Sequence, residues 1–270
     1  MKTSQMISST QNAKVKQVVL LQQKSAERRR MGRFIVEGVR ELLHCVEAGF
    51  EPEAVYYCRD ILSAYEGAAD VLSLARRVES YEVTPKVYER LACRGTTEGV
   101  VGVMKARRQT LDGLRLSASP LLMVLESVEK PGNLGAVLRS ADASAADAVI
   151  VCDPLTDLYN PNLIRSSIGA VFTVPTVACS SSDCIAFLKQ RHIQILTAQL
   201  QDSSLYYDTD MRKPTAIVMG TESTGLTDVW RQAADAHIRI PMLGRLDSLN
   251  VSVSAAILLF EAVRQRESNH

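Results

Sequence analysis

Residues 121–141 read LLMVLESVEKPGNLGAVLRSA, and this stretch decides the fold class of the second half of the chain. Its first five residues are all apolar, which is typical of a parallel strand that is buried on both faces. Pro131 and Gly132 then end the strand-like pattern, and residues 134–145 have the composition of a helix. A buried strand that leads through a short turn into a helix is the unit from which doubly wound α/β sheets are built.

The same alternation continues to the end of the chain. Strand-sized apolar stretches cover residues 148–152, 194–197, 215–219 and 237–240. Helical stretches lie between several of them, so the pattern predicts a mainly parallel sheet whose ligands bind beyond the carboxyl ends of the strands. The final helix is expected to bury one apolar face, formed by Leu249, Val253, Ala256, Ile257, Phe260 and Val263.

The first part of the chain predicts a smaller α/β unit, with short strands, short helices and a stretch of helical character over residues 61–77. Residues 105–120 are polar, contain Gly and Pro and have no clean period, which favours a connection between domains. We therefore expect a first domain over residues 1–106, a linker over residues 107–118 and a second domain over residues 119–270.

Composition excludes several classes of protein. A chain of 270 residues that is 46% hydrophobic is too apolar to be disordered. The start of the chain lacks the pattern of a signal peptide, and no apolar run is long enough for a membrane span. The six cysteines form no C-x-x-C pair and the four histidines are scattered. We therefore expect reduced thiols, a cytoplasmic location and no metal.

The net charge of +1 is the sum of a basic region and an acidic region whose charges nearly cancel. Residues 1–108 carry +5 and residues 109–270 carry −4, and the first 33 residues alone carry +7. A basic segment on a nearly neutral protein favours contact with a polyanion. A solvated helix face explains the same charges equally well.

Three polar motifs follow predicted strands. The first, residues 129–141, contains Asn133 and Arg139, which can face one cleft. The second, IVMGTESTGL at residues 217–226, contains Gly220 and Gly225, which permit a close backbone approach or a positive φ. It is neither the GxGxxG fingerprint nor a Walker A loop. The third, IRIPMLGRLDSLNVSVS at residues 238–254, leads into the last helix.

Each motif also has an ordinary structural interpretation. Asn133, Glu222, and either Ser248 or Asn250 can simply cap the helices that follow them. One such motif is weak evidence, whereas three at the strand ends of one domain favour a ligand site.

These motifs resemble those of a known family. The segments NLGAVLRSA, IVMGTESTGL and IPMLGRLDSLNVSVS are similar to the three signature motifs of the SpoU (TrmH-type) RNA ribose methyltransferases of the SPOUT class, over roughly residues 121–266. The segments SSTQNAKVK (residues 8–16) and RFIVEGVR (residues 33–40) resemble, more loosely, the substrate-binding domain that precedes the catalytic domain in many members.

The resemblance implies a small α/β RNA-binding domain followed by an α/β catalytic domain with a trefoil knot. It implies S-adenosylmethionine as the methyl donor, a ribose 2′-hydroxyl as the acceptor, ribosomal RNA more than transfer RNA as the substrate, and a homodimer whose active sites use both subunits. By the same resemblance, Gly220, Ile240 and Leu249 contact the cofactor through backbone groups. It also implies that Thr197, Ala198 and Met242 form part of the wall of the cofactor site.

The family pattern also assigns catalytic roles. Arg139 lies at the reaction centre and is often described as the base; because a free guanidinium keeps its proton, we expect it to stabilise the forming alkoxide and hold a phosphate. Asn133 positions Arg139 or the ribose, Glu222 orients Arg139 or its loop, and Ser248 and Asn250 fix the cofactor loop and the nucleotide. The candidate phosphate contacts are Lys14, Lys16, Arg28, Arg29, Arg30 and Arg33, with Arg94 a weaker one.

Other functions stay open at this point. They include a transfer RNA ribose methyltransferase, an enzyme of antibiotic resistance, a base methyltransferase and a non-catalytic RNA-binding protein of the same fold. An ordinary nucleotide-dependent enzyme is a further alternative, against which the missing glycine fingerprints argue.

Overall fold

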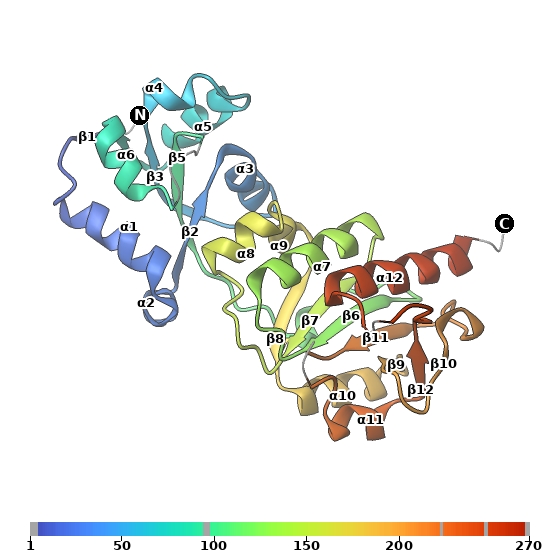
Figure 1. The fold of residues 1–270 in the computed structure, drawn as a ribbon. Coiled ribbons are helices and arrows are strands. Elements are labelled where there is room, and N and C mark those ends of the chain that lie inside the picture. The colour runs from blue at the N-terminus through green and yellow to red at the C-terminus, as the bar shows by residue number, and fades with distance from the viewer. Residues whose placement is uncertain (1–4, 94–97, 222–223, 246–247, 268–270) are drawn as a thin grey trace. The chain divides into compact units, whose positions relative to one another are not determined.

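The structure is a computed structural model, which describes residues 5–93, 98–221, 224–245 and 248–267. Its described residues form two compact units, one from Met1–Arg108 with Asp157–Thr173 and one from Gln109–Thr156 with Val174–His270 (Figure 1). The expected boundaries at residues 106, 107–118 and 119 stay a prediction. Within the described ranges, no helix has both the length and the apolar character needed to cross a membrane.

The first unit is built on a five-stranded mixed sheet with the order β1-β4-β3-β5-β2. Strand β5 runs antiparallel to β2 and β3, whereas β4 runs parallel to β1 and β3. The strands are β1 (Gln5–Ile7), β2 (Arg33–Glu37), β3 (Pro52–Tyr57), β4 (Glu79–Val83) and β5 (Val100–Lys105).

Helices of the first unit come from two parts of the chain. They are α1 (Ala13–Gln23), α2 (Ser25–Met31), α3 (Val39–Glu47), α4 (Arg59–Leu62), α5 (Ala68–Ala75), α6 (Pro85–Leu91), α8 (Pro161–Ser166) and α9 (Ala170–Thr173). The expected helical stretch over residues 61–77 consists of two separate helices, α4 and α5. Helix α4 ends at Leu62, and Gly67, with φ +83°, is the N-cap from which α5 begins.

Helices α8 and α9 pack in the first unit although they follow the strand Ala148–Cys152 of the second. The ring of Phe34 stacks on Tyr159 with centroids 4.2 Å apart, and it also stacks on Phe172. The guanidinium of Arg28 donates to Asp157 over 2.7 Å. Residues 157–173 are therefore held by aromatic packing and a partly buried ion pair.

The second unit contains a seven-stranded sheet with the order β10-β12-β9-β11-β6-β7-β8, and every described pairing in it is parallel. The strands are β6 (Leu121–Glu126), β7 (Ala148–Cys152), β8 (Thr176–Cys179), β9 (Gln194–Ala198), β10 (Ser204–Leu205), β11 (Thr215–Met219) and β12 (Ala236–Arg239). The expected mainly parallel sheet is confirmed, and the trefoil knot stays a prediction.

Helices cover both faces of this sheet. Helices α7 (Pro131–Ala143) and α12 (Val251–Glu267) pack together on one face, and α10 (Ser181–Gln190) and α11 (Asp228–Ala233) lie on the other (Figure 1). Short 3-10 turns occur at Leu111–Gly113 and Tyr206–Asp208. Because side chains alternate along a strand, Leu122 and Val124 pack against Leu188 and Trp230 of the second helical layer.

Helix α12 buries a different face from the expected one. Its buried apolar residues are Val251, Ala255, Leu258, Leu259 and Ala262. Val253 and Phe260, from the expected core face, are 47% and 48% exposed. The helix thus has a second apolar face that this chain does not cover with its own described residues.

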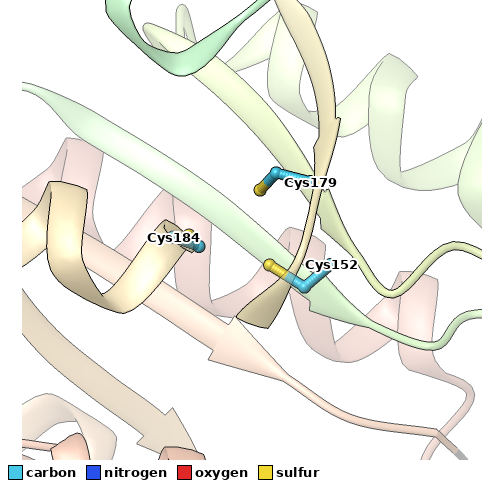
Figure 2. Close-up of side chains that lie close together, drawn as sticks. All are labelled: Cys152, Cys179 and Cys184. Carbon is cyan, nitrogen blue, oxygen red and sulfur yellow. The ribbon is translucent and has the colours of Figure 1, made fainter. Parts of the chain in front are cut away.

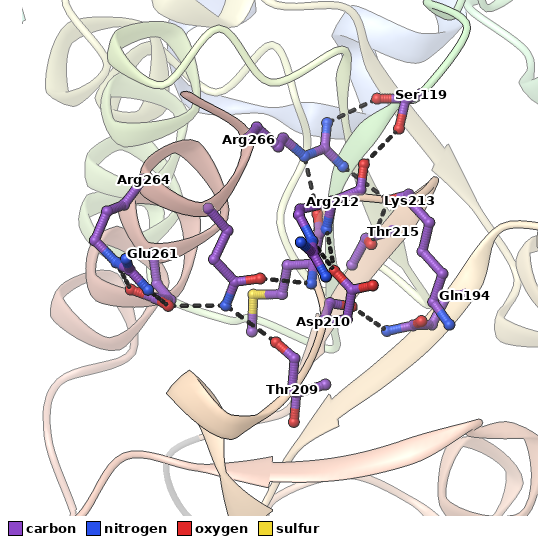
Figure 3. A network of polar contacts seen from close by, with 12 residues as sticks. Ser119, Gln194, Thr209, Asp210, Arg212, Lys213, Thr215, Glu261, Arg264 and Arg266 are labelled. Atoms are coloured by element: carbon purple, nitrogen blue, oxygen red, sulfur yellow. Dashed lines mark hydrogen bonds and ion pairs between the residues drawn. The ribbon is translucent and has the colours of Figure 1, made fainter. Parts of the chain in front are cut away.

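A polar network fixes the C-terminal end of α12 (Figure 3). The Arg266 guanidinium donates to the carbonyls of Ser119, Pro120, Met211 and Lys213 over 2.7–3.2 Å. Burial lowers its pKa from the ordinary arginine value. Since Ser119 and Pro120 precede β6 and Lys213 precedes β11, the network ties the helix to the starts of two central strands.

Candidate active site

A cavity of about 450 Å³ lies at the carboxyl ends of β9, β11 and β12 and is closed by the start of α12. Residues of five segments line it, within 198–201, 219–221, 224–226, 238–242 and 248–258, together with Arg231 of α11. This is the edge of a parallel sheet at which ligands bind.

Five of the six residues expected to contact the cofactor line this cavity: Ala198, Gly220, Ile240, Met242 and Leu249. Thr197 does not. Its side chain is fully buried, and its Oγ1 lies 2.6 Å from Nδ1 of His237. Thr197 therefore joins β9 to β12 beneath the cavity.

The loop after β11 has a shape that requires glycine. A Cβ atom on Gly220 would lie 2.2 Å from the carbonyl carbon and oxygen of Gly225, so the two backbone segments meet only because Gly220 has no side chain. Gly225 itself has φ +67°. Thr221 closes the turn, since its Oγ1 accepts from the Thr224 N–H over 3.0 Å. Glu222 lies outside the described residues.

A second, smaller cavity of about 190 Å³ adjoins the first. It is lined by Val128, Glu129, Lys130, Asn133, Gly220, Thr221 and Val251. Gly220, Thr221 and Val251 line both cavities. The two cavities therefore meet at the loop that follows β11.

Two of the expected catalytic residues contact each other at this junction. Nδ2 of Asn250 donates to Oδ1 of Asn133 over 3.2 Å. Asn250 also caps α12, because its Oδ1 accepts from the Ser252 N–H over 2.9 Å. The capping interpretation was wrong for Asn133, since α7 begins at Pro131 with Lys130 as its N-cap. Ser248 lines the larger cavity.

Arg139 lies apart from these residues. It is exposed on α7 and lines neither cavity. Among the residues that the structure describes, no hydrogen bond or ion pair reaches its guanidinium. One chain thus brings Asn133, Ser248 and Asn250 close to the residues that were expected to contact the cofactor and leaves Arg139 outside both cavities.

Glu126, which the sequence motifs did not single out, supports the segment that follows the larger cavity. Its buried carboxylate accepts from the Thr227 N–H over 2.9 Å and from the Thr227 hydroxyl over 2.6 Å. Thr227 directly follows Leu226, which lines the larger cavity. The available signal was a charged residue that ends an otherwise apolar strand, because a buried charge needs a defined partner.

The basic residues of the first unit divide into three groups. Arg28 is buried and donates to Asp157 and to the carbonyls of Leu21 and Gln22, so it has a structural role. Lys14, Arg30 and Arg33 form ion pairs with acidic side chains at 2.6–2.9 Å. Lys16 and Arg29 are exposed and have no ion pair within the described part of the chain. Arg94 lies outside the described residues.

Comparison with known proteins covers both units. Residues 120–260 match the SpoU rRNA Methylase family, and residues 12–102 match the MRM3-like substrate binding domain. A 23S rRNA (uridine(2479)-2′-O)-methyltransferase of Streptomyces viridochromogenes is 30% identical over 96% of this chain and 92% of its own.

Solved structures agree with these matches. The SpoU methyltransferase AviRb from Streptomyces viridochromogenes in complex with the cofactor AdoMet has a TM-score of 0.88 and 30% identity, over 96% of this chain and all of that one. An RNA 2′-O ribose methyltransferase has a TM-score of 0.85 and 38% identity, over 97% of this chain and 99% of that one. The chain therefore belongs to the SpoU rRNA methylase family of RNA methyltransferases, as its three motifs predicted.

Proposed function

We propose that this protein transfers a methyl group from S-adenosylmethionine to a ribose 2′-hydroxyl of ribosomal RNA. The observation that carries the proposal is the junction of two cavities at Gly220, Thr221 and Val251. One cavity suits a cofactor and the other opens beside Asn133, so donor and acceptor can meet at the loop between them. The printed functions of the relatives, ribose methylation of 23S rRNA and AdoMet binding, support the same assignment.

The larger cavity fits the cofactor in size and chemistry. Its volume lies within the range of about 300–1,000 Å³ that is common for small-molecule sites. Met242, Leu226 and Leu249 supply apolar wall, and the backbone beside Gly220 and Ile240 supplies polar groups. The cofactor brings an electrophilic methyl group on sulfonium, and the protein contributes position and electrostatics.

The acceptor hydroxyl needs help because a ribose hydroxyl is a poor nucleophile. We assign to the Arg139 guanidinium the stabilisation of the forming alkoxide and a contact with the adjacent phosphate. Asn133 positions the ribose, and Asn250 holds Asn133 while it caps α12. Ser248 fixes the cofactor loop, and the role of Glu222 in orienting Arg139 or its loop is kept from the family pattern.

A second copy of the chain completes the site in this proposal. Arg139 lines neither cavity of its own chain. Val253 and Phe260 present an uncovered apolar face on α12, and Leu249 is also exposed. Burial of such a face against the same face of a partner is the usual basis of a two-fold homodimer. We therefore place the Arg139 of one protomer at the cavities of its partner.

The first unit supplies RNA affinity in this account. Exposed Lys16 and Arg29 are the strongest phosphate contacts, and Lys14, Arg30 and Arg33 contribute after exchange of their intramolecular carboxylate partners. Arg28 is left out because its guanidinium is buried and satisfied. Since ribosomal RNA is the proposed substrate, we place the activity in the cytoplasm.

The test is methyl transfer in vitro from labelled S-adenosylmethionine to ribosomal and transfer RNA, followed by nucleoside analysis. We expect a labelled 2′-O-methylnucleoside from ribosomal RNA and none with Arg139→Ala. Label in transfer RNA alone would indicate a transfer RNA methyltransferase, and label on a base would indicate a base methyltransferase. The absence of label despite intact cofactor binding would indicate a non-catalytic RNA-binding protein.

A further inference from the structure

Three cysteine side chains converge at one end of the sheet of the second unit (Figure 2). Cys152 ends β7, Cys179 ends β8 beside it in the parallel register, and Cys184 comes from α10, which packs against β7. Their three Sγ atoms all lie within 4.8 Å of one another. No two of these residues are closer than five positions in the sequence, so the absence of a C-x-x-C pair concealed the cluster.

The spacing of the sulfur atoms suits one metal ion. A zinc–sulfur bond is about 2.3 Å, so three thiolates around one ion lie about 4 Å apart. Sulfur atoms that already lie within 4.8 Å reach this arrangement by small side-chain rotations. Thiolates prefer soft ions, above all Zn²⁺ and Cu⁺.

The surroundings provide access and exclude other protein ligands. Cys152 and Cys184 are fully buried, whereas Cys179 is partly exposed, which opens a path from solvent. The nearby carboxylates are engaged elsewhere: Asp153 accepts from the Ser181 hydroxyl and Asp183 from the Ser180 hydroxyl, each over 2.6 Å. Within the described residues, the ligand set is therefore the three thiols.

We propose that Cys152, Cys179 and Cys184 form a binding site for one thiophilic d¹⁰ metal ion. Each thiol releases its proton to solvent as its sulfur binds, and the oxidation state of the ion does not change. With Zn²⁺, a water molecule on the side of Cys179 completes four ligands; with Cu⁺, three thiolates suffice. The site would clamp β7, β8 and α10 together, and it does not share residues with the two cavities.

The test uses the full-length protein, stripped with a chelator under reducing conditions and titrated separately with Zn²⁺ and Cu⁺ against a chromophoric competitor. We expect one equivalent of at least one ion to bind, and Cys179→Ala to weaken that binding by at least about 100-fold because one thiolate of three is lost. Cys93→Ala removes an exposed thiol of the first unit and should bind like wild type. Tight binding of Zn²⁺ or of Cu⁺ identifies which ion the site takes.

A second measurement does not depend on whether buried variants fold. In the wild-type protein, the bound ion should slow alkylation of Cys179 at least about tenfold and leave Cys93 unaffected, because a coordinated thiolate is a blocked nucleophile. Equal affinity of wild type and Cys179→Ala for both ions, or unchanged alkylation of Cys179, would overturn the proposal. Neither result depends on methyl transfer, so the proposed function is tested separately.

Discussion

Asn250 and Asn133 are 117 positions apart, and the amide of one donates to the amide of the other over 3.2 Å. This bond joins the start of α12 to the first turn of α7. It lies where the two cavities meet, since Asn133 lines the smaller cavity and Val251, beside Asn250, lines both. The first and third motifs therefore act as one structural feature.

Replacement of Asn250 by Asp separates its two roles. Asp is as good an N-cap as Asn, so the free energy of unfolding should change by less than about 0.5 kcal/mol. The carboxylate cannot donate to Asn133, so methyl transfer should fall by about 10- to 100-fold, which corresponds to the loss of one directed polar contact. Asn250→Ala should reduce methyl transfer and should also lower the free energy of unfolding by about 1 kcal/mol, because the cap is lost. If Asn250→Asp retains full activity, the contact has no catalytic role.

Glu126 should act through the loop that follows β11. Its carboxylate accepts from both the N–H and the hydroxyl of Thr227, so Glu126→Ala removes both acceptors and leaves the Thr227 N–H without this partner. We expect the free energy of unfolding to fall by about 1–3 kcal/mol and cofactor affinity to fall several-fold. Thr227→Val serves as the paired variant. Strict additivity of the two variants in a double-mutant cycle would show that the contact carries no coupling.

Mixed dimers test whether Arg139 serves the partner's cavities. Gly220→Ala places a Cβ against the Gly225 backbone and should disable the cofactor cavity. Arg139→Ala should abolish methyl transfer and leave cofactor affinity within a few-fold of wild type. Each variant alone should be inactive.

After the two variants are mixed and exchange subunits, about a quarter of wild-type activity should return, because half of the dimers are mixed and each has one intact site. An inactive mixture with proven subunit exchange would place Arg139 in the site of its own chain.

Arg28 and Arg29 are neighbours with opposite expected phenotypes. Arg28→Ala removes a buried guanidinium that donates to half-buried Asp157 and to two carbonyls, and it should destabilise the protein by about 1–3 kcal/mol. Arg29→Ala changes an exposed residue, so stability should stay within about 0.5 kcal/mol. Its RNA affinity should fall, and the slope of log affinity against log salt should decrease by about 1. Denaturant unfolding measures the stability of both variants, and RNA binding at several salt concentrations measures the slope. An unchanged slope for Arg29→Ala would show that Arg29 does not contact RNA phosphates.

Local sequence signals predicted the elements of the fold that depend on local physics. The apolar runs of β6 and β11 each specify a buried strand, and the structure confirms both. Five of the six residues that the family motifs imply as cofactor contacts line the larger cavity, and periodicity alone did not indicate them.

Features that depend on distant partners could not be predicted in this way. Helix α12 is apolar on two faces, and no pattern says which face the chain itself covers. Arg28 resembles its exposed neighbours in sequence, and only Asp157, 129 positions away, makes it structural. Cys152 and Cys179 become neighbours only through the pairing of β7 with β8.

Ribose methylation of ribosomal RNA can be tested in cells by a map of the 2′-O-methyl groups in ribosomal RNA. The RNA should come from cells that lack this protein and from the same cells supplied with the wild type or with Arg139→Ala. We predict a 2′-O-methyl group at a defined position that is absent without the protein, restored by wild type and not restored by Arg139→Ala. Identical 2′-O-methyl maps in all three samples, or a difference confined to base methylation, would contradict it.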